Sequence, residues 1–174
     1  MATKATKPAA KKATGSARTD PATKLLMADH KEVHAMFQQY KKLADADAEA
    51  SEREALATEI CHALTVHATI EEELFYPAAR EAEVDADLLD EAEVEHASAK
   101  ELIAQIEAMS PDDDLYDAKL TVLGEYIDHH VGEEQDEMFP KLKKAGMDTK
   151  SVGAALNERK QALMAEMAEH AEAA

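Results

Sequence analysis

Two short stretches of this sequence repeat one arrangement of histidine, glutamate and proline. In the first, His67 is followed by Glu71, and in the second, His130 is followed by Glu134. Each stretch closes with an aromatic residue and a proline, at the same interval after its glutamate. Residues four apart share one face of a helix, so each stretch can present an imidazole nitrogen and a carboxylate oxygen together. Such pairs are candidate metal ligands.

Each stretch is also preceded, at a similar distance, by a histidine that directly follows an acidic residue. These dipeptides are Asp29-His30 and Glu95-His96. One His-x-x-x-Glu pair arises readily by chance in a chain with 8 His and 23 Glu, but two in corresponding places are specific. The sequence therefore predicts two related helical hairpins, each with three candidate metal ligands.

The composition predicts an all-α fold. The 174 residues include only five Gly and five Pro, and the chain lacks β-branched and aromatic runs. The single cysteine, Cys61, excludes an internal disulfide and a cysteine-rich metal motif, and we interpret it as a core or boundary residue.

Apolar residues recur at helical spacing in five segments, at about residues 21–44, 51–80, 86–109, 111–146 and 149–170. Asp20-Pro21 and Ser110-Pro111 are typical helix starts. Short connections between helices of these lengths favour an antiparallel up-down-up-down four-helix bundle with a metal site in its core.

We divide the chain into a disordered, Ala/Lys/Thr-rich basic tail (1–20), the bundle (21–146) and a C-terminal amphipathic helix (147–174). The helix should pack on the bundle or mediate self-association. The tail contrasts with a net charge of −18 for the whole chain. It is able to contact nucleic acid, although a solubilising tail without a partner is the simpler interpretation. No stretch is apolar enough to cross a membrane, and we expect a cytoplasmic protein.

The paired motifs resemble those of the hemerythrin-like, or HHE cation-binding, family, over about residues 24–144. The resemblance implies a four-helix bundle that holds two non-haem iron ions (Fe2+/Fe3+). It implies that four imidazoles bind iron and two carboxylates bridge the ions: His30, His67, His96, His130, Glu71 and Glu134.

The chain departs from the oxygen-carrying members of that family at one position. These have a His-x-x-x-His pair on the third helix, whereas here Lys100 follows His96 at that spacing. The first helix instead contains His30 and His34. We hypothesise that the asymmetry is exchanged, so that one iron has three imidazoles and the second has a vacant position for a small ligand. In this hypothesis the three imidazoles are those of His30, His34 and His67; the alternative is that His34 is a surface or supporting residue.

Two further residues near the second motif are ambiguous. His129 lies five residues before Glu134, the longer spacing that the oxygen carriers use, but alignment of the two repeats favours His130. Tyr126 lies one turn before His130 and is either a hydrogen-bonding neighbour of the metals or a core residue. Glu72, Glu73 and Glu133 are most simply a solvated face, with an extra ligand or an iron relay as the alternative.

The resemblance implies a protein that binds dioxygen or another small diatomic ligand for storage, delivery or sensing. Imidazole and carboxylate ligands suit iron, and zinc is also compatible with them. The alternatives are a di-iron enzyme, for peroxide breakdown, ferroxidase chemistry or repair of nitrosative damage, and an iron store or iron sensor. We expect a binding protein rather than an enzyme, and no residue is assigned a catalytic role.

Overall fold

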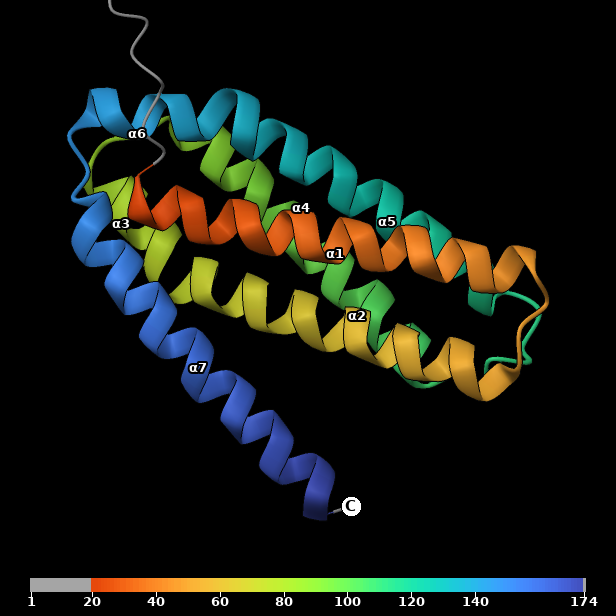
Figure 1. The fold of residues 1–174 in the computed structure, drawn as a ribbon. Helices are drawn as coiled ribbons and strands as arrows, with labels where there is room; N and C mark the ends of the chain where they lie inside the picture. The colour runs from red at the N-terminus through yellow and green to blue at the C-terminus, as the bar shows by residue number, and fades with distance from the viewer. Residues whose placement is uncertain (1–19, 174) are drawn as a thin grey trace, which may run out of the picture.

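The structure, a computed structural model, describes residues 20–173, with side chains to residue 170 (Figure 1). It confirms the predicted all-α fold, and no strand occurs within this range. The long helices are α1 (Pro21–Asp45), α2 (Ala50–Ile70), α4 (Ala86–Glu107), α5 (Tyr116–Glu133) and α7 (Thr149–Ala173). The predicted tail lies outside the described residues except for Asp20. The Asp20 carboxylate caps α1 by accepting the N–H of Thr23 at 3.0 Å, as expected for a helix start.

The second and fourth predicted helices each contain a turn of π-helix at the repeated motif. These turns are η1 (Glu71–Phe75), which leads into α3 (Tyr76–Glu81), and η2 (Glu134–Met138), which leads into α6 (Phe139–Ala145). The N–H of each motif aromatic donates to the carbonyl of the motif glutamate five residues earlier. The proline that follows has no N–H for the α-helical pattern. Both wider turns therefore begin at the two motif glutamates, a placement common at functional sites.

The helices α1, α2, α4 and α5 lie side by side around a shared interior (Figure 1). Helix α1 contacts α2 and α5, and α4 contacts the same two helices. The interior contains two apolar clusters. One, near α3 and α6, includes Phe75, Leu89 and Leu142; the other, toward the far end, includes Ile60 and Leu120.

A layer of buried polar side chains separates the two apolar clusters. Along α1, for example, Leu26 belongs to the first cluster and Val33 to the second, and the buried His30 lies between them. On α4 the buried His96 separates Ala92 from Ala99 in the same way. The fold thus places ionisable groups at one level, in the middle of an apolar core.

Helix α7 packs against α1 and α2, and its C-terminal half diverges from α2 (Figure 1). Leu156 is fully buried in the first apolar cluster. Gly153 allows the close approach: a Cβ at this position would lie 2.8 Å from the backbone nitrogen of Ala22 and 2.9 Å from the carbonyl carbon of Pro21. Among residues 20–173, no helix combines the length and apolar character that crossing a bilayer requires.

The predicted start of the fourth helix at Ser110-Pro111 is wrong. Helix α5 begins at Tyr116, because the side chains of Ser110 and Asp113 close a turn before it. The Ser110 hydroxyl accepts the N–H of Asp112 at 3.3 Å, and the Asp113 carboxylate accepts the N–H of Ser110 at 2.9 Å. The same capping chemistry that starts helices here stabilises a turn.

Substitution of Gly153 by alanine should loosen α7. The new methyl group would meet backbone atoms, so we expect the free energy of unfolding to fall by about 1–3 kcal/mol, the usual cost of overpacking. Gly132→Ala is the control, because nothing lies within 4 Å of a Cβ at this position. The higher helix propensity of alanine should raise the free energy of unfolding of this variant by up to about 1 kcal/mol. Urea unfolding and hydrogen exchange of α7 amides measure both effects. Equal behaviour of the two variants would contradict the close approach.

Candidate metal centre

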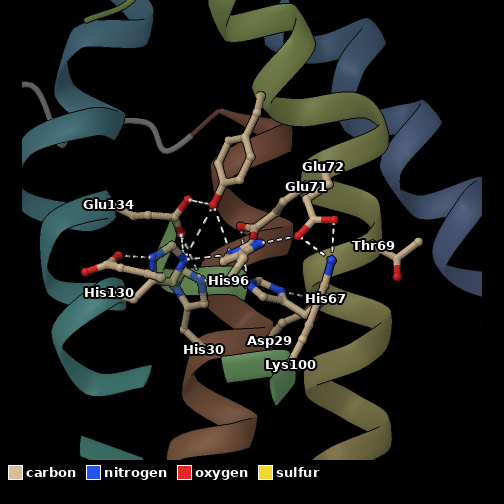
Figure 2. Close-up of polar contacts among 12 residues, drawn as sticks. Asp29, His30, His67, Thr69, Glu71, Glu72, His96, Lys100, His130 and Glu134 are labelled. Carbon is tan, nitrogen blue, oxygen red and sulfur yellow. Dashed lines mark hydrogen bonds and ion pairs between the residues drawn. The ribbon is translucent and has the colours of Figure 1, made fainter. Parts of the chain in front are cut away.

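The structure brings six of the predicted residues together in the buried polar layer (Figure 2). Each is at most 7% exposed, and together they come from all four helices that surround the interior. His30 comes from α1, His67 and Glu71 from the α2–η1 junction, His96 from α4, and His130 and Glu134 from the α5–η2 junction.

The four imidazoles form two pairs that meet through their Nε2 atoms. The Nε2 atoms of His30 and His67 are 3.0 Å apart, and those of His96 and His130 are 3.1 Å apart. Two adjacent ligands of one octahedral ion, at metal–nitrogen distances of about 2.1 Å, are separated by about 3 Å. Each pair therefore has a spacing that suits binding to one metal ion.

Each glutamate contacts one imidazole of each pair. Oε1 of Glu71 lies 3.2 Å from Nε2 of His67, and its Oε2 lies 3.4 Å from Nε2 of His96. Oε2 of Glu134 lies 3.3 Å from Nε2 of His30 and 3.8 Å from Nε2 of His130. Both carboxylates are thus placed between the two pairs, as bridging ligands would be.

Three carboxylate oxygens in this layer receive no hydrogen bond from any described residue. They are both oxygens of Glu71 and Oε2 of Glu134, in side chains that are at most 1% exposed. A buried carboxylate without compensation costs several kcal/mol, and bound cations are one of the ways in which proteins compensate it. The donor set, the spacing and these oxygens fit a metal centre.

The carboxylates of the layer favour positive charge around them, whether it is carried by protons on the imidazoles or by bound cations. Burial raises the pKa of Glu71, but the facing imidazoles of His67 and His96 outweigh burial and hold it well below its usual range. Burial lowers the pKa of His67, and the carboxylates of Glu71 and Asp29 outweigh burial and raise it to about 10. The Glu71 carboxylate is therefore ionised, and it stabilises positive charge among the imidazoles.

The outer nitrogen of every imidazole in the layer has a polar neighbour. Nδ1 of His67 is 3.4 Å from Asp29, and Nδ1 of His130 is 2.8 Å from Glu95. These are the acidic residues of the two acidic-His dipeptides, and each supports the other histidine of its own pair. Such contacts fix the ring orientation and direct Nε2 inward.

The residue after each motif glutamate supports an imidazole of the other hairpin. Oε1 of Glu72 lies 2.9 Å from Nδ1 of His96, and the amide of Gln135 lies 3.0 Å from Nδ1 of His30. Glu72 is therefore more than part of a solvated face. The repeat that is visible in the sequence thus extends to the residues that orient the ligands.

Tyr76, the aromatic residue of the first motif, also reaches the layer, although its sequence pattern does not distinguish it from a core residue. Its hydroxyl donates to Oε1 of Glu134 at 3.1 Å and lies 3.2 Å from Nε2 of His96. Burial, together with the charges of Glu71 and Glu134, raises the pKa of Tyr76 well above its usual value, so the phenol stays protonated. The second motif has Phe139 at the corresponding place, which stacks beside His30 at a centroid distance of 6.2 Å. The asymmetry of the layer is therefore a hydroxyl on one side and a phenyl ring on the other.

The structure does not bring His34 to this layer. Its side chain is 52% exposed and lies 2.9 Å from Asp128 and 2.8 Å from the amide of Gln38. Tyr126 is also exposed, at 51%, and Cys61 is buried in the second apolar cluster. His129 is on the surface, and His130 takes the buried position. We therefore leave His34 out of the ligand set that we propose below.

A buried layer of imidazoles and carboxylates from four helices defines the class of helical His/carboxylate metal-site proteins. Residues 22–142 match the family model of the Hemerythrin HHE cation binding domain, so the chain belongs to that family. It is similar in structure to a hemerythrin HHE cation binding domain-containing protein from Mycobacterium kansasii, with a TM-score of 0.66. The two are 19% identical, and the match covers 83% of this chain and 88% of that one. A comparison with curated proteins finds no match.

Replacement of His67 and of His34 by alanine should have different effects on metal binding. We expect His67→Ala to lower metal affinity by at least about tenfold, as loss of a metal-site group commonly does. His34→Ala should leave affinity and stoichiometry unchanged, because its ring contacts Asp128 and not the layer. Metal analysis after gel filtration measures both. Loss of metal in His34→Ala would restore the hypothesis that this residue is a ligand.

Proposed function

We propose that this chain is a non-haem di-iron protein that binds dioxygen or a related small ligand. The two ions would be held in an up-down-up-down four-helix bundle by two histidine pairs, one pair to each ion. The carboxylates of Glu71 and Glu134 would bridge them, and His30, His67, His96 and His130 complete the ligand set. When bound, such an iron pair supplies electrons that dioxygen can accept.

The single observation that carries this proposal is the position of the two carboxylates. Each contacts an imidazole of both pairs, and their unbonded buried oxygens lie between those pairs. A mononuclear site would leave one histidine pair and part of one carboxylate without a function. Iron is favoured over Mg²⁺ or Ca²⁺ because most of the donors are imidazole nitrogens.

A small cavity beside the layer supports a diatomic ligand. It has a volume of about 30 Å³ and is enclosed by α2, α4 and α5. The histidines that line it are His67, His96 and His130. The apolar residues that line it include Leu64, Ile103 and Ile127. This volume suits a molecule about the size of water, and apart from the histidines, Thr65 and Lys100 the lining is apolar. Small apolar gases fit these conditions.

Tyr76 favours a di-iron enzyme as the second candidate. Its protonated hydroxyl lies beside His96 and Glu134, within reach of a molecule bound at the second histidine pair. A positioned acid of this kind can donate a proton to a reduced oxygen species. The first candidate predicts a reversible complex, whereas the second predicts turnover, so one experiment separates them.

The purified chain should be loaded with iron(II) without air, and its absorption spectrum recorded as dioxygen is admitted and removed. We expect two iron ions per chain and a visible band that appears with dioxygen and disappears on its removal. An irreversible change with consumption of dioxygen or peroxide would favour the enzyme.

Glu71→Gln and Glu73→Gln are a matched pair of variants for the same experiment. Glu71 is fully buried between the histidine pairs, whereas Glu73 faces solvent and pairs with Arg159. Glu71→Gln should lower iron content and abolish the spectral change, and Glu73→Gln should preserve both. Binding of one ion per wild-type chain would contradict the dinuclear centre.

A further inference from the structure

A second group of metal-type ligands lies on the surface of α4 and α5. His129 and Glu133 repeat the His-x-x-x-Glu spacing one residue before the buried motif, and they face outward. Nε2 of His129 lies 3.3 Å from Oε1 of Glu133 and 3.5 Å from Oε1 of Glu95. One nitrogen and two carboxylates thus lie close enough to share an ion. We call Glu95, His129 and Glu133 the surface trio.

Glu95 connects the surface trio to the buried centre. Its Oε1 faces His129, while its Oε2 lies 2.8 Å from Nδ1 of the buried His130. The Glu95 side chain is 25% exposed, which is intermediate between His129 at 65% and His130 at 5%. A single carboxylate therefore spans the boundary between solvent and the proposed iron ligands.

The other two carboxylates that orient buried imidazoles are neutralised by lysines. Asp29, which supports His67, accepts from Nζ of Lys160 at 2.6 Å. Glu72, which supports His96, accepts from Nζ of Lys100 at 2.6 Å.

Glu95 differs from these two carboxylates. Among residues 20–173, it pairs with histidines and with no lysine or arginine. Asp29 and Glu72 each have a lysine ammonium group beside them. Glu95 instead has the imidazole of His129, which also contacts the carboxylate of Glu133. A mobile cation can take the place of the ammonium group here.

The surface around the trio suits a divalent cation. The trio lines an open hollow together with Asp90, Glu91 and Val94. In the part of the chain that the structure describes, no lysine or arginine lines this hollow; Arg80 pairs with Asp90 at its edge and with Glu93, which does not line it. Imidazole and carboxylate donors on a negative surface attract ions such as Fe²⁺, Mn²⁺ and Zn²⁺.

We propose that the surface trio binds a divalent cation and delivers it to the buried centre beside His130. This inference rests on the proposed di-iron function for its delivery step, whereas the surface site itself does not depend on it. Glu95 contacts both His129 and the buried His130. An ion held by the trio would therefore be bound by a carboxylate that also contacts His130.

An equilibrium titration tests the site. Iron-loaded chain is titrated with Mn²⁺, and bound Mn²⁺ is counted from the loss of the free Mn²⁺ resonance. We expect one Mn²⁺ per wild-type chain, with affinity lowered by about tenfold or more in His129→Ala and Glu133→Gln. His34→Ala is the matched control, because it removes an exposed histidine that pairs with a different carboxylate, Asp128. Absence of Mn²⁺ binding to the wild type, or equal binding to His129→Ala, would overturn the site.

A kinetic experiment tests delivery. Metal-free chain is mixed with limiting iron(II) without air, and the rate and extent of filling are followed separately. His129→Ala should fill several-fold more slowly and reach the same final iron content, whereas His34→Ala should match the wild type. Equal rates in all three proteins would overturn delivery. If the wild type takes no iron but binds one Mn²⁺ that His129→Ala loses, the di-iron function fails and the surface site stands.

Discussion

The structure depends on the burial of two carboxylates among four imidazoles in the middle of an apolar core. Three oxygens of Glu71 and Glu134 receive no hydrogen bond from the described residues, and each carboxylate contacts both histidine pairs. This arrangement is stable only if positive charge compensates it. The apolar clusters on both sides supply packing that the polar layer does not. The fold thus has apolar packing of its own on both sides of the polar layer.

The two-fold repeat explains how one short motif builds a layer with two histidine pairs and two carboxylates. Each motif supplies an imidazole and a carboxylate from one helix, and the residues beside the ligands orient the other imidazoles. Both π-turns begin at the motif glutamates. The halves differ where Tyr76 faces the second pair and Phe139 faces the first. The difference gives the layer one side with a proton donor and one without.

The spacing of histidine and glutamate, the two acidic-His dipeptides and the family resemblance together predicted seven residues for the layer, and six of them meet. Periodicity alone was insufficient for His34. A position four residues after the buried His30 shares its helix face only approximately, and the ring of His34 turns to Asp128 on α5. Tyr76 was missed because a buried tyrosine and a core phenylalanine leave the same apolar signal. Only the position of its hydroxyl among His96, His130 and Glu134 shows the difference.

The start of α5 and the π-turns were also beyond the sequence. The side chains of Ser110 and Asp113 accept hydrogen bonds from backbone N–H groups of the turn that precedes α5, so these capping residues do not mark the helix boundary. A π-turn depends on one extra residue between hydrogen-bonded groups, and helix propensity is nearly the same with or without it. Each π-turn is closed by the N–H of the aromatic residue before the motif proline. The backbone hydrogen bonds of Tyr76 and Phe139 show this, whereas the sequence alone does not.

Anomalous diffraction at the iron edge, from crystals of the iron-loaded chain, tests the central claim most directly. The account predicts two iron peaks in the polar layer, one beside each histidine pair, with the carboxylates of Glu71 and Glu134 between them. A single peak, or peaks that lack contact with either carboxylate, would contradict it.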